Sequence, residues 1–198
     1  MIPATDRLDF RELDERDVDN LFALDGDPEV MRYLESRPAT REQVESEILP
    51  DYLSYYARYD DYGYWAGQTR ADGEFVGWFG MHPVVPSDQW IDLWPDSPDD
   101  FSVVSLGYRL RRTAWGKGYA SEGTGAMVRY AFADLGAREL VATTMAVNTG
   151  SRRVLEKSGL RHTCTLHLDF DEPLPGNEHG DVEYRLTRDD WLASARAV

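Results

Sequence analysis

The sequence predicts one α/β (α+β) domain in which helices cover a mixed sheet. Strand-like and helix-like patterns alternate along the chain, with no internal repeat and no low-complexity linker. Hydrophobic residues make up 42% of the chain and aromatic residues 12%, as in a folded globule. A chain of 198 residues has the length of one domain with a substantial core. We therefore expect residues 1–198 to form a single domain.

The first half of the chain shows one strand pattern, three helix signals and a hairpin. The strand pattern alternates in polarity, and the hairpin turns at Asp72-Gly73. The helix signals are an apolar face, an N-cap before a proline, and a capping box. In chain order these elements are expected at residues 7–13, 13–24, from Asp27-Pro28, 40–56, and 64–69 with 74–82.

The second half begins with an acidic loop, residues 84–100, which carries Trp90 and Trp94. Its size suits either a lid over a substrate or an exposed loop whose tryptophans pack on the domain. After it come strand and helix patterns and then a tail that contains Trp191. The expected elements are a strand at 101–111 with one face of Val104, Leu106, Tyr108 and Leu110, a helix from Ala120 to about Leu135, a strand at 139–147, a helix at 151–158, and strands near 161–170 and 182–187.

Composition and charge exclude several classes of protein. The chain has 36 Asp+Glu against 21 Lys+Arg, which argues against general binding to the phosphate backbone of nucleic acids. It shows neither the start of a signal peptide nor an apolar run long enough for a membrane span. Cys164 is the only cysteine, so neither an internal disulfide nor a multi-cysteine metal site is expected. These features predict a cytoplasmic protein without a metal.

The run WGKGYA at residues 115–120 is the most informative short motif. Two common phosphate-binding templates do not fit it. A Walker A loop needs Ser or Thr after Gly-Lys, but Gly118 stands there. A dinucleotide fingerprint needs a third glycine where the chain has Ser121. The glycines alone are equally consistent with an ordinary turn.

The charge around this turn favours an anion site. No Asp or Glu occurs from Phe101 to Ser121, and this window holds four cations. The turn leads into a helix N-terminus, where free N–H groups and the helix dipole favour an anion. Gly118 would let the backbone approach phosphate oxygens closely. A second window without acids, 140–155, carries Arg152 and Arg153, so the two windows together suit a polyphosphate ligand.

Two blocks together resemble the acyl-CoA-binding core of the GNAT N-acetyltransferases, in particular the branch of RimJ/RimL type. The family signature [QR]-x-x-G-x-[GA] reads Trp115-x-x-Gly118-x-Ala120 here, with tryptophan in the first place. The second block is N-x-x-S-x-x-V-L-E-K-x-G, from Asn148 to Gly159. The resemblance covers essentially the whole chain in element order. It implies a mostly antiparallel central sheet flanked by helices, with splayed central strands.

The resemblance also implies a cofactor site. Backbone groups of Tyr108, Arg109 and Leu110 would bind the pantetheine arm of acetyl-CoA. Amides of the turn would wrap its pyrophosphate, and Arg152 or Arg153 would reach a phosphate. Asn148 would meet the pantetheine or its thioester end, or serve as a helix N-cap, roles that do not exclude each other. The residues of the turn are Trp115, Gly116, Lys117, Gly118, Tyr119 and Ala120.

For the chemistry, the resemblance implies direct acetyl transfer to an amine in a ternary complex. A backbone N–H between Leu106 and Tyr108 would polarise the thioester, with Gly107 as the site of a strand bulge. The usual general acid and base positions hold Leu155 and Thr143 instead. Ser151 is the best remaining hydroxyl to serve the departing thiolate. An acceptor of low pKa, such as an α-amino group or a small-molecule amine, needs the least help from a base.

Several questions about partners stay open at the level of sequence. The expected acceptor is an amine, on a small molecule or a protein N-terminus, and a homodimer is possible. His82, Asp181 and Glu183 fit either a substrate cleft or ordinary strand positions. Because an acidic cleft suits polycations, an antibiotic-modifying acetyltransferase of aminoglycoside type is one alternative. A CoA-binding module without transferase activity is the other.

Overall fold

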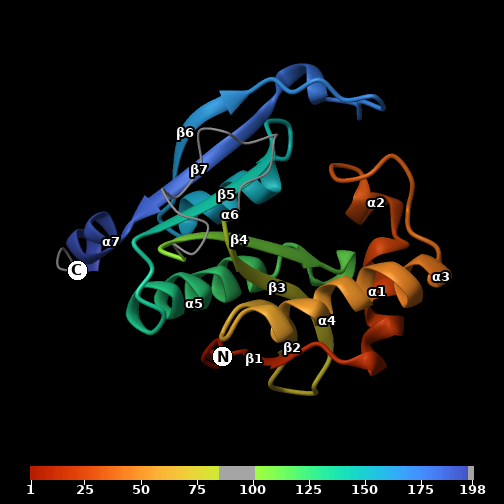
Figure 1. The fold of residues 1–198 in the computed structure, drawn as a ribbon, viewed down its shortest axis with the longest axis horizontal. Helices are drawn as coiled ribbons and strands as arrows, with labels where there is room; N and C mark the ends of the chain where they lie inside the picture. The colour runs from red at the N-terminus through yellow and green to blue at the C-terminus, as the bar shows by residue number, and fades with distance from the viewer. Residues whose placement is uncertain (85–100, 196–198) are drawn as a thin grey trace.

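The computed structural model describes residues 1–84 and 101–195, so the acidic loop, apart from Val84, lies outside the described residues. A seven-stranded sheet forms its centre, in the order β1-β2-β3-β4-β5-β7-β6 (Figure 1). Neighbouring strands are antiparallel except β4 and β5, which are parallel, so the predicted mixed, mostly antiparallel sheet is confirmed. The strands are β1 Leu8–Glu12, β2 Gly63–Thr69, β3 Phe75–Pro83, β4 Val103–Leu110, β5 Glu139–Met145, β6 Arg161–Leu166 and β7 Asp181–Thr187.

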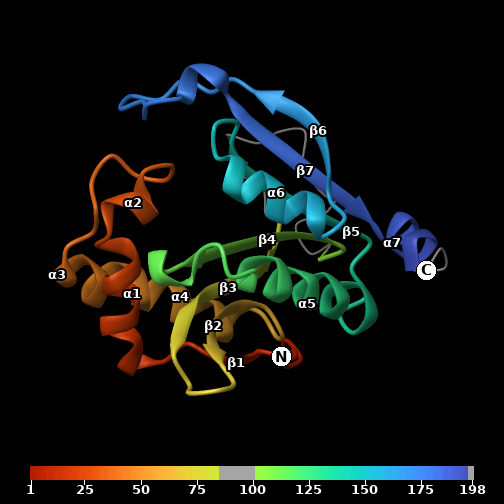
Figure 2. The same cartoon turned by 180° about the vertical axis from the view of Figure 1, so that it is seen from behind.

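Helices cover both faces of the sheet. Figure 1 looks at the face covered by α1 to α4, and Figure 2 looks at α5 and α6 on the opposite face. On the first face Trp78 of β3 joins an apolar cluster with Leu21 and Leu49. On the second, Phe79 joins a larger cluster with Met127 and Phe132. The helices are α1 Val18–Asp25, α2 Pro28–Met31, α3 Arg41–Gln43, α4 Leu49–Arg58, α5 Tyr119–Ala133, α6 Thr149–Lys157 and α7 Arg188–Ala195.

The helices begin where the caps in the sequence predict. The Asp27 carboxylate accepts a hydrogen bond from the N–H of Glu29, with Pro28 in the first turn of α2. Thr40 and Gln43 form both hydrogen bonds of a capping box at α3. Local side-chain chemistry therefore fixes these helix starts.

Two helical regions differ from the prediction. The helix expected over 40–56 consists of α3, a π-helical turn at Val44–Ile48, and then α4. The C-terminal tail expected after β7 forms the helix α7, in which Trp191 packs against Phe132 at a ring distance of 5.4 Å. Thr187 also accepts the N–H of Asp190 at 3.2 Å, so a local cap and this tertiary contact together stabilise the helix.

The sheet opens between its central strands. β4 and β5 pair only over Val103–Ser105 and Glu139–Val141. Beyond this point β4 continues along β3 as far as Leu110, while β5 continues along β7 as far as Met145. The splay predicted for the central strands is therefore confirmed, and among the described residues it leaves one edge of β4 without a partner strand from Leu106 onward.

Candidate active site

The register of β4 decides which of its backbone groups face the opening. Arg111 donates its N–H to Val76, and Val84 donates its N–H to Val103. Residues bonded to β3 alternate along an antiparallel pair, so the odd-numbered residues of β4 bond to β3. The N–H groups of Leu106, Tyr108 and Leu110 therefore point into the opening between β4 and β5.

This alternation corrects two expectations. The backbone groups of Gly107 and Arg109 point to β3, so these residues do not offer backbone hydrogen bonds to a ligand in the opening. The bulge expected at Gly107 is also absent, because the register of β3 and β4 runs without a shift over the whole of β4. A bulge occurs in β2 instead, between Gly67 and Gln68.

The glycine turn leads directly from β4 to α5. Gly116 and Gly118 have φ values of 71° and 85°, a left-handed conformation that glycine adopts without strain. Gly118 is the N-cap residue of α5 and has no side chain to occupy the free amides of the first helical turn. Those amides, with the positive end of the helix dipole, form a site for an anion.

Trp115 closes the other side of this turn. Its indole Nε1 donates a hydrogen bond of 2.8 Å to the carbonyl of Leu110, which occupies one of the two lone pairs of that oxygen. Trp115 is 42% exposed as a residue, so part of its apolar surface is accessible beside the opening. Tryptophan at this place, where the family signature has Gln or Arg, therefore braces the end of β4.

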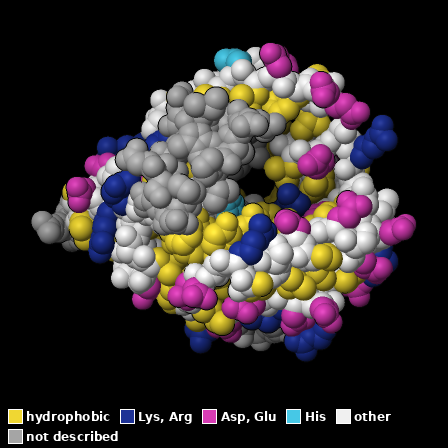
Figure 3. Space-filling model, in the orientation of Figure 1, with side chains coloured by type: hydrophobic (Ala, Val, Ile, Leu, Met, Phe, Trp, Pro, Cys, Tyr) yellow, Lys and Arg dark blue, Asp and Glu magenta, His cyan; other side chains and the backbone are white. Residues whose placement is uncertain are grey.

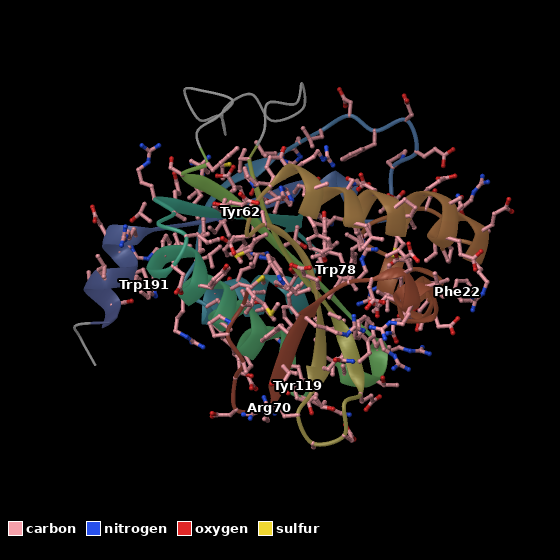
Figure 4. The ribbon with its side chains drawn as sticks, turned by 60° about the horizontal axis from the view of Figure 1, so that its bottom comes forward. Phe22, Tyr62, Arg70, Trp78, Tyr119 and Trp191 are labelled. Atoms are coloured by element: carbon pink, nitrogen blue, oxygen red, sulfur yellow. The ribbon has the colours of Figure 1, made fainter. Side chains whose placement is uncertain are left out.

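Arg7, which the sequence reading did not select, lies against the turn. Its guanidinium donates to the carbonyl of Lys117 at 3.0 Å, pairs with Glu122 and lies over the Tyr119 ring. Burial alone would raise the pKa of Glu122, but hydrogen bonds from Thr5 and Arg7 lower it below its usual value. Figure 4 shows Tyr119 beside Arg70, at the end of the molecule where the β2–β3 hairpin turns. The turn is thus held by the N-terminal segment, more than 100 positions away in sequence.

Only some of the cations near the glycine turn are free to contribute positive charge to an anion site there. Arg111 and Arg112 lie 3.8 Å from Glu74 and 3.4 Å from Asp27, so acids from outside the acid-free window partly neutralise them. The Arg109 side chain points to the opposite face of the sheet, where it pairs with Asp25. The positive charge available to an anion at the turn is therefore smaller than the count of four cations in the sequence indicated.

The second block places a hydroxyl pair at the opening. Asn148 caps α6, because its side-chain oxygen accepts the N–H of Ser151 at 3.1 Å. The Tyr108 hydroxyl lies 3.0 Å from Ser151 Oγ and donates to the Ser151 carbonyl at 3.1 Å. Burial raises the pKa of Tyr108, so the phenol keeps its proton and remains a hydrogen-bond donor. The tyrosine was selected from the sequence for its backbone alone, and the structure adds its side chain.

The two arginines of this block have different surroundings. Arg152 donates to the Tyr184 hydroxyl and to the carbonyl of Ala146, both at 3.1 Å, and so braces α6 against β5 and β7. Arg153 is exposed on the helix surface. Of the pair, Arg153 remains the candidate for a phosphate contact.

We expect Asn148→Ala to destabilise the protein by about 1 kcal/mol, because the first turn of α6 loses its cap. For a chain of this size that corresponds to a fall in Tm of roughly 2–4 °C, measured by calorimetry. Asn148→Ser, which restores a capping oxygen, should keep most of the stability. Equal Tm values for the alanine and serine variants would contradict a capping role.

The usual acid and base positions cannot act as such. Leu155 is 1% exposed and belongs to the apolar core. Thr143 is exposed on β5, but a threonine hydroxyl is not a base at neutral pH.

Asp181 and Glu183, the two acidic positions of β7 considered for a substrate cleft, differ in their surroundings. Glu183 is 3% exposed and bonded to Thr163 and Arg185, whereas burial raises the pKa of Asp181.

Two further features concern metals and membranes. Within residues 1–84 and 101–195, no group of three or more metal-ligating side chains lies close enough together to hold an ion. Over the same residues, no helix combines the length and the apolar character that a membrane span requires.

Comparisons with known proteins agree with this geometry. The family model of the acetyltransferase (GNAT) domain matches residues 7–161. The FsC-acetyl coenzyme A-N(2)-transacetylase of Aspergillus fumigatus is 36% identical over 191 residues, which cover 95% of this chain and 77% of that protein. Two solved structures share the fold. They are the RimL ribosomal L7/L12 alpha-N-protein acetyltransferase with coenzyme A (TM-score 0.72, 18% identity, 96% and 98% coverage) and the aminoglycoside acetyltransferase AAC(6')-Ib with coenzyme A and kanamycin (TM-score 0.73, 18% identity, 95% and 99% coverage).

Proposed function

This chain belongs to the GNAT acetyltransferase family and is an acetyl-CoA-dependent N-acetyltransferase, and we propose that it acetylates an α-type primary amine by direct transfer in a ternary complex. The observation that carries the proposal is the open edge of β4, which lies between the glycine turn and the hydroxyl pair of Tyr108 and Ser151. This arrangement suits a thioester with its phosphates at one end and its reacting carbonyl at the other.

The pyrophosphate of acetyl-CoA would bind the free amides at the start of α5. The pantetheine arm would then run along β4 and hydrogen-bond the N–H groups of Tyr108 and Leu110. The N–H of Leu106 or Tyr108 would donate to the thioester oxygen, which becomes negatively charged as the amine attacks. One such donor can stabilise the transition state by roughly 3–4 kcal/mol.

The reaction forms a C–N bond and breaks the C–S bond of the thioester. The amine loses a proton and the departing sulfur gains one. Ser151 would turn its single O–H from Tyr108 to the sulfur and donate a hydrogen bond to the thiolate as it leaves. Ser151 would thus supply the hydroxyl that the usual general acid provides in relatives, because Leu155 stands at that position here. Its hydrogen bond to Tyr108 of β4 supports this role.

The choice of an α-type amine follows from the missing base. Only a neutral amine attacks, and at pH 7 roughly 10% of an α-amine is neutral, against well under 0.1% of a lysine side chain. The name of the Aspergillus fumigatus relative, which specifies an N(2)-transacetylase, agrees with this choice. An amine of low pKa therefore makes a strong general base unnecessary.

Two blocked forms of lysinamide test the proposal, since one leaves the α-amine free and the other leaves the side-chain amine free. We expect faster thiol release from acetyl-CoA with the free α-amine, by more than about 100-fold, as the ratio of neutral fractions at pH 7 requires. Ser151→Ala should lower kcat about tenfold, the worth of one hydrogen bond to a charged group, and leave the KM for acetyl-CoA nearly unchanged. CoA binding without thiol release in the presence of either amine would instead indicate a binding module.

A further inference from the structure

The face of β4 opposite α5 is only partly covered by the described helices, although β4 is the central strand. Ser105, Gly107 and Arg109 lie on this face, and all three are partly exposed. Figure 3 shows that the molecule is hollowed on this side, between the arm of β6 and β7 and the helices α1 to α4. An amine that approaches the backbone N–H groups of Leu106 and Tyr108 from this side passes over Gly107, which has no side chain.

Aromatic side chains form a wall beside this path. They come from α4 and from strands β2 and β3, and their rings contact one another in a continuous cluster at centroid distances of 4.0–5.8 Å. The Trp78 ring lies nearest to Gly107, since a Cβ added there would stand 3.6 Å from it. Figure 4 shows Trp78 near the centre of the molecule, beneath α4. The members of the wall are Tyr52, Tyr55, Tyr64, Trp78 and His82.

Arg109 is held at the edge of this wall. Its Nη1 donates to Asp25 Oδ1 at 2.5 Å, and its guanidinium lies 5.3 Å from the centre of the Trp78 ring. Asp25 is fully buried, whereas 16% of the Arg109 side chain is exposed. The Nε atom is buried without a partner among the described residues. Because Asp25 takes Nη1, Nη2 is the nitrogen left to meet a ligand in the cleft.

We propose that Arg109 is a specificity-determining residue, which hydrogen-bonds a carbonyl oxygen on the carbon next to the acceptor amine. The inference rests on the proposed function. Arg109 follows Tyr108 directly in β4, so its side chain leaves the strand one residue, about 3.3 Å, beyond the N–H that would hold the thioester. From there it extends along the face over which the acceptor would approach, with the guanidinium between Asp25 and the Trp78 ring, and an acceptor that lies over Gly107 would direct its carbonyl to this guanidinium.

The charge balance defines the class of acceptor. Asp25 neutralises Arg109, so the site has no excess positive charge that would require a carboxylate, and an amide or ester carbonyl suffices. An acceptor without a carbonyl would cover the Nη2 donor and leave it unpaired, and sites built to hydrogen-bond a group discriminate strongly against analogues without it. The aromatic wall would contact an apolar or aromatic substituent of the acceptor.

Two amines test this inference on the wild-type enzyme. L-Phenylalaninamide carries the carbonyl, and 2,2-difluoro-2-phenylethylamine has a similarly low pKa and the same ring but no carbonyl. We expect kcat/KM to favour the amide at least about tenfold, as a charge-assisted hydrogen bond should. No preference for the amide would overturn the inference. If neither amine is acetylated while CoA binds, the proposed function fails first, and the inference fails with it.

Substitution of Arg109 then tests whether this residue makes the choice. Arg109→Lys should lower the amide-to-difluoroamine ratio about tenfold, because lysine keeps the charge near Asp25 but loses the forked donor. The ratio does not depend on the fraction of folded enzyme. The matched control is Arg185→Lys, an arginine bonded to Glu183 and Glu139 in the same sheet, which should leave the ratio unchanged. A ratio unchanged by Arg109→Lys, or lowered equally by both substitutions, contradicts a role for Arg109.

Discussion

Gly118→Asp should weaken CoA binding by at least about 100-fold, since it places a carboxylate where the pyrophosphate is proposed to bind. At a separation of about 4 Å and an effective dielectric constant near 20, two like charges repel by roughly 4 kcal/mol. The change also puts a Cβ 3.3 Å from the Arg7 guanidinium, which can shift because it is 49% exposed. The fold should therefore survive, and calorimetric titration with CoA measures the loss.

The neutral variant Gly118→Asn separates charge from backbone strain. Asparagine has the shape of aspartate and tolerates the left-handed conformation that φ of 85° requires. We expect the Asn variant to bind CoA much more tightly than the Asp variant, with both showing similar Tm values. Equal CoA affinities for the two variants would mean that this turn does not hold the phosphates.

The turn and the helix caps were predictable because their determinants are local. The left-handed glycines, the start of α5 and the cap at Asn148 each depend on a few consecutive residues. The opening of the sheet was predicted from the resemblance of two sequence blocks to the GNAT family, and hydrophobic periodicity did not indicate it. What sequence reasoning missed depends on contacts across the fold, as with Arg7 at the turn and the Tyr108 hydroxyl at Ser151.

Arg109 illustrates why the count of nearby charges misled. In sequence it is one of four cations in a window without acids, and that pattern favoured a phosphate ligand. Strand alternation instead turns its side chain to the face of α1, where Asp25 is fully buried. A single position in the alternation thus moves a positive charge from the proposed cofactor side to the proposed acceptor side. The partner lies 84 residues away, so no local signal revealed the pairing.

Asp25→Asn should destabilise the protein by about 3 kcal/mol, because it removes the charge that compensates the buried Arg109. Removing one partner of a buried ion pair typically costs 3–5 kcal/mol, as the remaining ion stays buried without compensation. An arginine guanidinium does not lose its proton in proteins, so Arg109 stays charged in the variant and does not escape the cost. For a chain of 198 residues the expected fall in Tm is roughly 6–12 °C.

An exposed ion pair and a double variant make this test specific. Asp19→Asn removes a partner of Arg41 at the surface, where the aspartate is 81% exposed, and Tm should not change measurably. Replacing both buried partners, Asp25→Leu with Arg109→Met, should recover most of the stability lost in Asp25→Asn, since no unpaired charge remains. The same double variant should still favour neither amide nor difluoroamine as acceptor. Recovered stability without recovered selectivity would show that the pair is retained for substrate choice and not for the fold.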